Sequence, residues 1–200
     1  MVKRTVPRWS TFAPLLQRRT GASGLQRRLD SAVDIHDLAR LAHRRAPRAV
    51  FDYVDGAASD EVSKARNADA FRRVEFQPRV LRDVEEVSTS TSILGQVSSM
   101  PFAFAPTGFT RMMHVGGEAA VARVAARSGI PYALSTVGTT SIEDVARASG
   151  EGRRWFQLYV VKDRERSRDM LQRARRNGFD VLVLTVDVPV SGARPRDARS

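Results

Sequence analysis

The chain has 200 residues with a formal net charge of +11, and 42% of them are hydrophobic, enough for the core of one domain or of part of a larger one. Its lack of cysteine excludes disulfides, cysteine metal sites and thiol catalysis. No apolar run approaches the ~20 residues that cross a bilayer, and the basic N-terminus lacks the apolar core of a secretory signal, so we expect a cytoplasmic protein.

The N-terminal part is predicted to be helical after a basic, flexible arm. Residues 1–31 form the arm, because arginines flank the Gly-Ala-Ser-Gly stretch at 21–24. Residues 32–99 form a helical segment and its connection. The expected helices cover about 35–45, with Asp34 as N-cap, then 50–54, and a third that Ser59 or Asp60 caps and that runs to Arg72.

From residue 100 onward, short apolar strands are predicted to alternate with helices. The expected strands cover 100–105, 130–134, 155–160 and 181–186. The expected helices cover about 117–128, from Thr140 or Ser141 to 149, and from Asp163 to 177. Strands separated by helices pair in parallel, which predicts an α/β fold, either a TIM barrel or a doubly wound sheet. No G-x-G-x-x-G follows the first strand, which argues against the dinucleotide-binding version of the second.

Polar side chains lie at or near the C-terminal end of each predicted strand. They are Thr107, Ser135, Gln157 with Tyr159, and Thr185 with Asp187. In a TIM barrel these ends form the catalytic face. The alternative is that strands simply end in polar residues, but four successive cases favour a shared site.

Five blocks of sequence occur in a recognisable order. They are Phe51-Asp52-Tyr53 with Gly56-Ala57-Ala58-Ser59-Asp60-Glu61, the block FRRVEFQPRVL at 71–81, Ala105-Pro106-Thr107-Gly108, Phe156-Gln157-Leu158-Tyr159, and Leu184-Thr185-Val186-Asp187-Val188-Pro189. From about residue 32 to 200, this series resembles the N-terminal half of the FMN-dependent α-hydroxy-acid dehydrogenases, the family of lactate dehydrogenases and glycolate oxidases. The basic arm and the segment at 153–159 are most similar to the quinone-linked L-lactate dehydrogenases.

The resemblance implies a TIM (β/α)8 barrel, of which residues 100–200 would form the first half, with FMN as cofactor. Pro106, Thr107 and Gly108 match the loop that passes the flavin ring. Ser135, Gln157 and Thr185 match residues that hydrogen-bond the flavin. A buried glutamine would be costly without such a partner, whereas a serine or threonine alone could equally be a local cap.

The same resemblance implies oxidation of an L-2-hydroxy acid, with L-lactate the favoured substrate, to a 2-oxo acid. Tyr53, Tyr159 and Arg194 match substrate contacts, and arginine can bind a carboxylate with two hydrogen bonds. Tyr159 and Asp187 are the expected catalytic residues, because Asp187 matches the carboxylate that pairs with the family's catalytic histidine. Without the resemblance, Tyr53 would be a core tyrosine, Arg194 a surface arginine and Asp187 an N-cap.

The histidines of this sequence do not supply that base. His36, His43 and His114 lie outside any H-x-G-G-R context, and no metal cluster is expected. A chain with about four βα units is therefore expected to be inactive alone, with open sheet edges that favour weak stability or self-association.

Expected partners are a small 2-hydroxy acid, an electron acceptor (quinone, oxygen or cytochrome) and, in the intact family, further copies in a homo-oligomer. Besides the cytoplasm, a peripheral position at the inner membrane stays open. Two alternatives remain: a non-catalytic fragment that needs a partner half, and a basic nucleic-acid-binding module. No nucleic acid is expected, since no recognition motif accompanies the charge.

Overall fold

The computed structural model describes residues 23–188 and 190–199, which divide into two units after Arg48. In the described part of the first unit lie helices α2 (Gly24–Asp30) and α3 (Ile35–His43). The predicted cap Asp34 accepts a hydrogen bond from Asp37 N at 2.8 Å. Helix α2 was not predicted: Ser23 caps it by accepting from Gln26 N at 3.1 Å, so residues 24–30 of the expected flexible arm are helical. Residues 1–22 of that arm lie outside the described residues.

The second unit begins within α4 (Arg48–Asp55), at Ala49, and continues with α5 (Val62–Arg72). The prediction that Ser59 or Asp60 caps α5 is wrong, because Glu61 is the N-cap and makes no side-chain cap bond there. Its backbone is left-handed, with φ 59°, and its carboxylate accepts instead from Ala57 N at 3.2 Å. Side-chain contacts across the turn therefore replace the expected cap.

A hairpin of β1 (Thr91–Ile93) and β2 (Gln96–Ser98) precedes the main sheet and was not predicted. Gly95 turns it with φ 78°, a conformation that glycine adopts without strain. Arg153 Nη2 donates to Ile93 O at 3.1 Å, and Gln96 Nε2 donates to Asp180 Oδ2 at 3.0 Å. The hairpin therefore lies at the N-terminal end of the strands, opposite the predicted site.

The main sheet is parallel, in the order β3 (Tyr132–Leu134), β4 (Arg154–Leu158) and β5 (Phe179–Leu184). The predicted strand at 100–105 is reduced to a single bridge between Phe104 and Tyr132. Phe104 N donates to Pro131 O at 2.9 Å, and Ala133 N donates to Phe104 O at 3.0 Å. Pro131 has no N–H to extend this ladder, and Pro101 and Pro106 lie at either end of the predicted strand.

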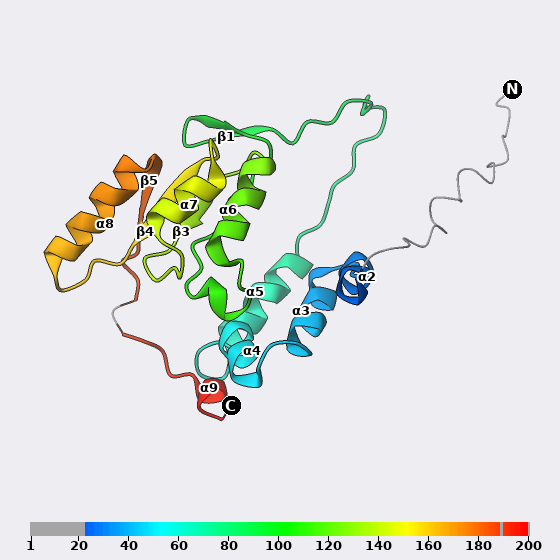
Figure 1. Ribbon diagram of the computed structural model, residues 1–200. Coiled ribbons are helices and arrows are strands. Elements are labelled where there is room, and N and C mark those ends of the chain that lie inside the picture. Colours follow the sequence, from blue (N-terminus) through cyan, green and yellow to red (C-terminus); the bar gives the residue numbers. More distant parts are fainter. Residues whose placement is uncertain (1–22, 189, 200) are drawn as a thin grey trace, which may run out of the picture. The chain divides into compact units, whose positions relative to one another are not determined.

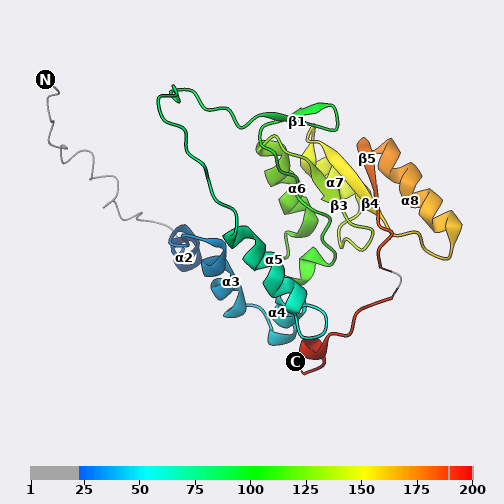
Figure 2. The same cartoon turned by 180° about the vertical axis from the view of Figure 1, so that it is seen from behind.

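Helices α6 (Gly117–Arg127), α7 (Ile142–Ser149) and α8 (Arg164–Arg176) pack on the sheet (Figures 1 and 2). Their caps follow prediction: Ser141 accepts from Asp144 N, and Asp163 from Glu165 N and Arg166 N. The helices and strands share one buried core, made of Ala122, Ala125, Ile130, Tyr132, Leu134, Ile142, Val145, Phe156, Leu158, Ala174 and Phe179. Leu182 and Leu184 of β5 remain 51% and 50% exposed, so the core does not cover the far side of this strand.

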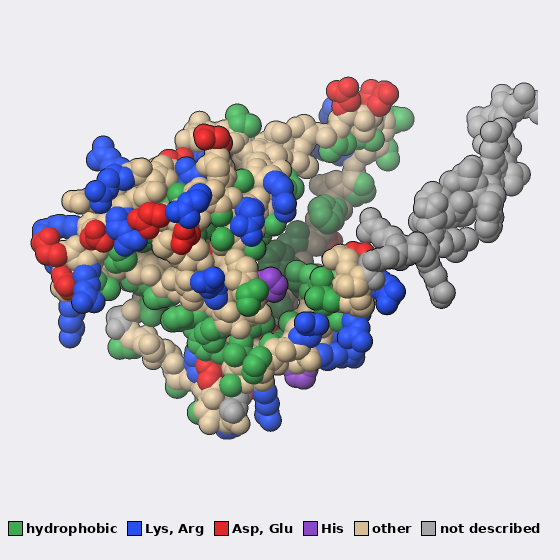
Figure 3. Space-filling view, in the orientation of Figure 1, with side chains coloured by type: hydrophobic (Ala, Val, Ile, Leu, Met, Phe, Trp, Pro, Cys, Tyr) green, Lys and Arg blue, Asp and Glu red, His purple; other side chains and the backbone are tan. Residues whose placement is uncertain are grey.

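Two short helices complete the second unit, the 3-10 helix η1 (Thr110–Met112) and α9 (Pro195–Ala198). No described helix combines the length and apolar character needed to cross a membrane. On the face in Figure 3, arginines intermingle with acidic side chains over α7 and α8, and the ion pairs there include Arg173 with Glu143 at 2.7 Å and Arg147 with Asp144 at 2.6 Å.

Candidate functional site

Gln157 connects the ends of the three strands of the parallel sheet. Its side chain is 2% exposed. Ser135 Oγ donates to Gln157 Oε1 at 3.2 Å, and Gln157 Nε2 donates to Thr185 Oγ1 at 2.8 Å. The structure thus brings together three of the predicted flavin-binding residues, one from the end of each strand.

The orientation of the Gln157 amide follows from its neighbours. Thr136 N lies 3.1 Å from one end of the amide, and a backbone N–H can only donate, so that end must be the oxygen. The other end is therefore the NH2 group, which has two hydrogens. Among the described residues one of these binds Thr185, whereas the second makes no hydrogen bond, and neither does the hydroxyl hydrogen of Thr185.

The loop at 106–109 lies against the residues that follow β3. Phe109 N donates to Val137 O at 3.1 Å. A Cβ on Gly108 would come within 2.6 Å of Val137 Cγ2, so this close approach needs glycine. Thr107 is exposed, and its hydroxyl donates to Ala105 O at 3.5 Å. No hydrogen bond among the described residues joins Thr107 to Ser135, Gln157 or Thr185.

Glu118, in the first turn of α6, fixes this loop and was missed by the sequence analysis. Its side chain is fully buried. It accepts from Thr139 N at 2.7 Å, from Thr139 Oγ1 at 2.9 Å, from Thr140 Oγ1 at 2.6 Å and from Thr110 N at 3.3 Å. Burial alone would raise the pKa of Glu118, but these hydrogen bonds lower it from its usual 4.5 to about 2. A carboxylate thus holds η1 and the loop after β3 together.

Acid should weaken this connection in a defined range of pH. Because the folded pKa of Glu118 lies below the unfolded one, its contribution to stability is complete above about pH 4.5 and is lost as the pH falls toward 2. We expect the difference in unfolding free energy between the wild type and Glu118→Gln, measured with urea, to stay constant from pH 6 to about pH 5 and to shrink progressively from there to pH 3. A difference that stays constant over this range would contradict the assignment.

Tyr53 and Arg194 form a second cluster, in which a cation lies over an aromatic ring. Arg194 Cζ is 4.9 Å from the ring centroid of Tyr53. The same ring meets Phe109 edge-on, with centroids 6.3 Å apart. Phe109 directly follows Gly108. Tyr53, and with it Arg194, therefore lies beside the loop that is predicted to pass the flavin.

Tyr159 and Asp187, the predicted catalytic residues, follow β4 and β5. Tyr159 N donates to Thr136 Oγ1 at 2.9 Å, and its side chain is 38% exposed. Asp187 is exposed, and in the described part of the chain its carboxylate has no hydrogen-bond or ion-pair partner. The imidazole of His114 accepts a hydrogen bond from Gly116 N at 3.0 Å. No group of three or more potential metal ligands occurs among the described residues.

Thr136 is a second residue that the sequence analysis missed. Besides the bond from its N–H to Gln157 Oε1, its hydroxyl donates to Gln157 O at 2.7 Å and accepts from Tyr159 N. Its position directly after Ser135 at a strand end was the available signal. A pocket of about 770 Å3 also includes Thr136, together with Lys162, Asp163 and Met170, but it opens toward α8 and excludes Ser135, Gln157 and Thr185.

Comparisons with known proteins agree on one family. The family model described as FMN-dependent dehydrogenase matches residues 42–200. A Mycobacterium tuberculosis protein provisionally named an L-lactate dehydrogenase is 52% identical over 100% of this chain and 48% of its own length. Human 2-hydroxyacid oxidase 2 is 41% identical over 85% of this chain and 48% of its own length. A crystal structure of mandelate oxidase matches with a TM-score of 0.79 and 41% identity, over 84% of this chain and 50% of that one. The chain thus spans about half the length of the relatives it matches.

Proposed function

Because the chain belongs to the FMN-dependent dehydrogenase family, we propose that it supplies the flavin-facing strand ends and part of the carboxylate-binding site of an enzyme that oxidises an L-2-hydroxy acid to a 2-oxo acid. L-lactate is the proposed substrate. The observation that carries the proposal is the Ser135–Gln157–Thr185 arrangement, which leaves hydrogen-bond donors available at the C-terminal ends of three parallel strands.

The chemistry of these donors fits FMN. The edge of a flavin ring alternates hydrogen-bond acceptors with a donor, and an amide side chain with its oxygen and nitrogen fixed in place can match such an edge. Gln157 and Thr185 supply the donors, while Gly108 lets the loop at 106–109 lie close to Val137. Thr107, in the same loop, would reach the ring through its exposed hydroxyl. When bound, FMN supplies a two-electron acceptor, which the protein itself lacks.

The proposed substrate contacts are Tyr53, Tyr159 and Arg194. Arg194 offers a guanidinium to the carboxylate of the hydroxy acid, and a phenol can donate a further hydrogen bond. Asp187 would hold the imidazole that removes a proton from the substrate and would stabilise its charged form. The oxidation of the hydroxy acid releases two electrons and two protons, and the electrons would finally leave to an external acceptor such as a quinone, oxygen or a cytochrome.

The sequence holds no H-x-G-G-R motif for this imidazole, which motivates a complementation experiment. The purified chain is mixed with FMN and with the second half of the M. tuberculosis relative, the part that this chain does not match. We expect the mixture to retain flavin absorption after gel filtration and L-lactate to bleach it without oxygen. We expect no bleaching from the chain alone or with D-lactate.

Asp187→Asn tests the proposed role of this carboxylate in the same mixture. This variant keeps the shape of the side chain but loses its charge, so it should retain the flavin and lose most of the L-lactate bleaching, by roughly 100-fold or more in rate. A mixture that binds no flavin would contradict the proposal, and so would bleaching of the chain alone by L-lactate.

A further inference from the structure

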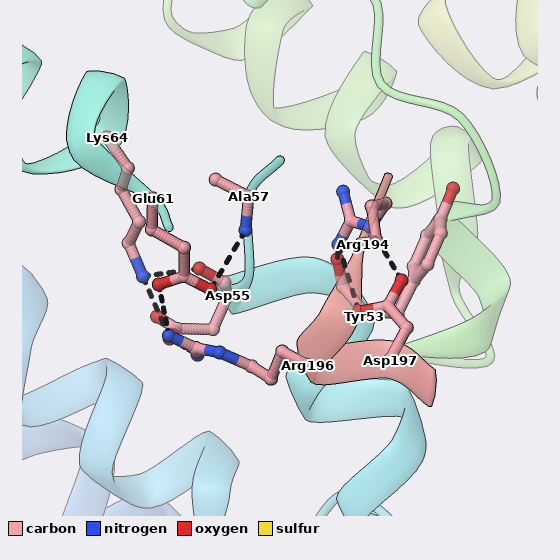
Figure 4. A network of polar contacts seen from close by, with 8 residues as sticks. All are labelled: Tyr53, Asp55, Ala57, Glu61, Lys64, Arg194, Arg196 and Asp197. Carbon is pink, nitrogen blue, oxygen red and sulfur yellow. Dashed lines mark hydrogen bonds and ion pairs between the residues drawn. The ribbon is translucent and has the colours of Figure 1, made fainter. Parts of the chain in front are cut away.

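Residues 193–198, here called the α9 segment, carry two arginines, Arg194 and Arg196. Both contact the end of α4 or the turn that joins it to α5, which together are called the α4–α5 turn. Figure 4 shows Arg194 beside Tyr53 and Asp197, and Arg196 beside Asp55 and Glu61. The contacts with Tyr53, Asp55 and Glu61 join residues 135 to 141 positions apart in the sequence.

Arg194 has most of its donors engaged. Its Nε donates to Asp197 Oδ2 at 2.6 Å, and its Nη2 donates to Asp197 Oδ1 at 3.3 Å and to Tyr53 O. The Nη1 group makes no hydrogen bond within the described part of the chain, so its two hydrogens are available to a ligand. The guanidinium thus has a fixed orientation and one free end.

Arg196 bridges two carboxylates. Its Nη1 donates to Asp55 Oδ2 at 2.6 Å, and its Nη2 donates to Glu61 Oε2. Lys64 Nζ also lies 2.9 Å from Asp55 Oδ2, so the four side chains form one network. The hydrogen bond from Lys64 and then that from Arg196 lower the pKa of Asp55. A single exposed ion pair contributes little to stability, whereas a partly buried network with bidentate arginine contributes more; here 34% of Arg196 and 21% of Glu61 is exposed.

The backbone connects the two contacts closely. Ser59 N donates to Ala193 O at 2.8 Å. A Cβ on Gly56 would lie 3.3 Å from Arg196 Cδ and 3.4 Å from Arg194 Nη2. Both arginine side chains therefore pack against the same glycine. Arg194 and Arg196 therefore approach the turn between α4 and α5 at the same point.

We infer that Arg196 is a positioning residue: through Asp55 and Glu61 it fixes the α9 segment on the α4–α5 turn, and so holds Arg194 over Tyr53 with its free end toward the substrate carboxylate. This inference rests on the proposed function. It assigns no contact with substrate to Arg196 itself. Lysine is a poor replacement, since one ammonium cannot form the planar, bidentate bridge between two carboxylates.

The first test uses the chain by itself, without flavin. In NMR spectra, cross-peaks between the Tyr53 ring protons and the Arg194 Cδ protons should be present in the wild type and lost in Arg196→Gln. Arg199→Gln is the matched control, because Arg199 follows α9 directly and is exposed; it should keep the cross-peaks. Retention of the cross-peaks in a folded Arg196→Gln variant would overturn the inference, whatever the flavin experiments show.

The second test uses the flavin-loaded mixture described above. Arg196→Gln should raise the KM for L-lactate about tenfold, as expected when one charge-assisted contact is weakened, with kcat changed less than twofold. Arg196→Lys should recover part of this loss, and Arg199→Gln should match the wild type. In an Arg194→Ala background, adding Arg196→Gln should raise KM no further. Additive effects of the two substitutions on KM would overturn the inference. A wild-type mixture that fails to retain flavin would count against the proposed function alone.

Discussion

Replacing Glu118 with alanine is expected to lower the free energy of unfolding by about 3–5 kcal/mol. The carboxylate is fully buried and accepts hydrogen bonds from Thr110, Thr139 and Thr140. Alanine would leave these donors unpaired and a cavity in their place, and each unsatisfied buried donor costs about 1–3 kcal/mol. Urea unfolding of the purified chain at pH 7 measures the effect.

Two further variants separate the hydrogen bonds from the loss of volume. Glu118→Gln keeps the shape and one acceptor oxygen, and the threonine hydroxyls can rotate toward its NH2 group, so about half of the loss is expected. Glu151→Ala removes an exposed glutamate and should change stability by less than about 0.5 kcal/mol. A loss below about 1 kcal/mol for Glu118→Ala would show that the loops do not depend on this carboxylate.

Replacing Gln157 with leucine is expected to weaken FMN binding about 100-fold in the complementation mixture. Leucine has a similar volume but removes the Nε2 donor that we assign to the flavin and the acceptor for Thr136 N. The flavin loses the bond from Nε2 and, because Nε2 no longer orients the Thr185 hydroxyl, the bond from Thr185 as well. Two hydrogen bonds in a buried site, at about 1.5 kcal/mol each, correspond to this factor. Flavin fluorescence, which changes when the ring leaves solution, measures the dissociation constant.

Folding and flavin binding must be distinguished for this variant. Gln157→Leu should also lower the stability of the flavin-free chain, by about 1–3 kcal/mol, because Thr136 N loses its partner. Gln172→Leu is the matched control, since Gln172 is exposed on α8, and it should leave both quantities unchanged. A Gln157→Leu protein that is folded and binds FMN with the wild-type constant would refute the flavin assignment.

The repeating part of the fold was predictable because its signals are local. Apolar strands alternate with helices whose caps, Ser141 and Asp163, precede them directly in the sequence. The predicted fold class, an α/β chain that forms about half of a TIM-barrel-family protein, is confirmed by the solved structures it matches, and so is the family with its FMN cofactor. The hydroxy-acid substrate remains a proposal.

The deviations from prediction arise where distant contacts override local preference. Phe104 forms only one bridge because its neighbour Pro131 lacks an N–H. Ser59 and Asp60 are good capping residues, yet α5 begins after Glu61, which pairs with Arg196, 135 residues away. Helix α2 and the hairpin were missed because their sequences are short and weakly patterned.

The candidate site shows the same division between local and distant information. Ser135, Gln157 and Thr185 were predictable, since parallel strands bring their C-terminal ends to one edge of the sheet. The role of Glu118 was not predictable, because a glutamate in the first turn of a helix is ordinarily solvated and interacts favourably with the helix dipole. The role of Arg196 was equally hidden, since only the fold brings the α9 segment to Asp55.

The position of β4 between two neighbours determines the order in which the site should open on warming. In the described part of the chain, residues 154–156 of β4 pair with β3 and all of β4 pairs with β5, whereas β5 pairs only with β4. Backbone amides of β4 should therefore exchange with deuterium only when the whole second unit unfolds, while those at 185–188 and 190–199 exchange through local opening. We expect the carboxylate contact at Arg194 to be lost at temperatures where the Gln157 hydrogen bonds still persist.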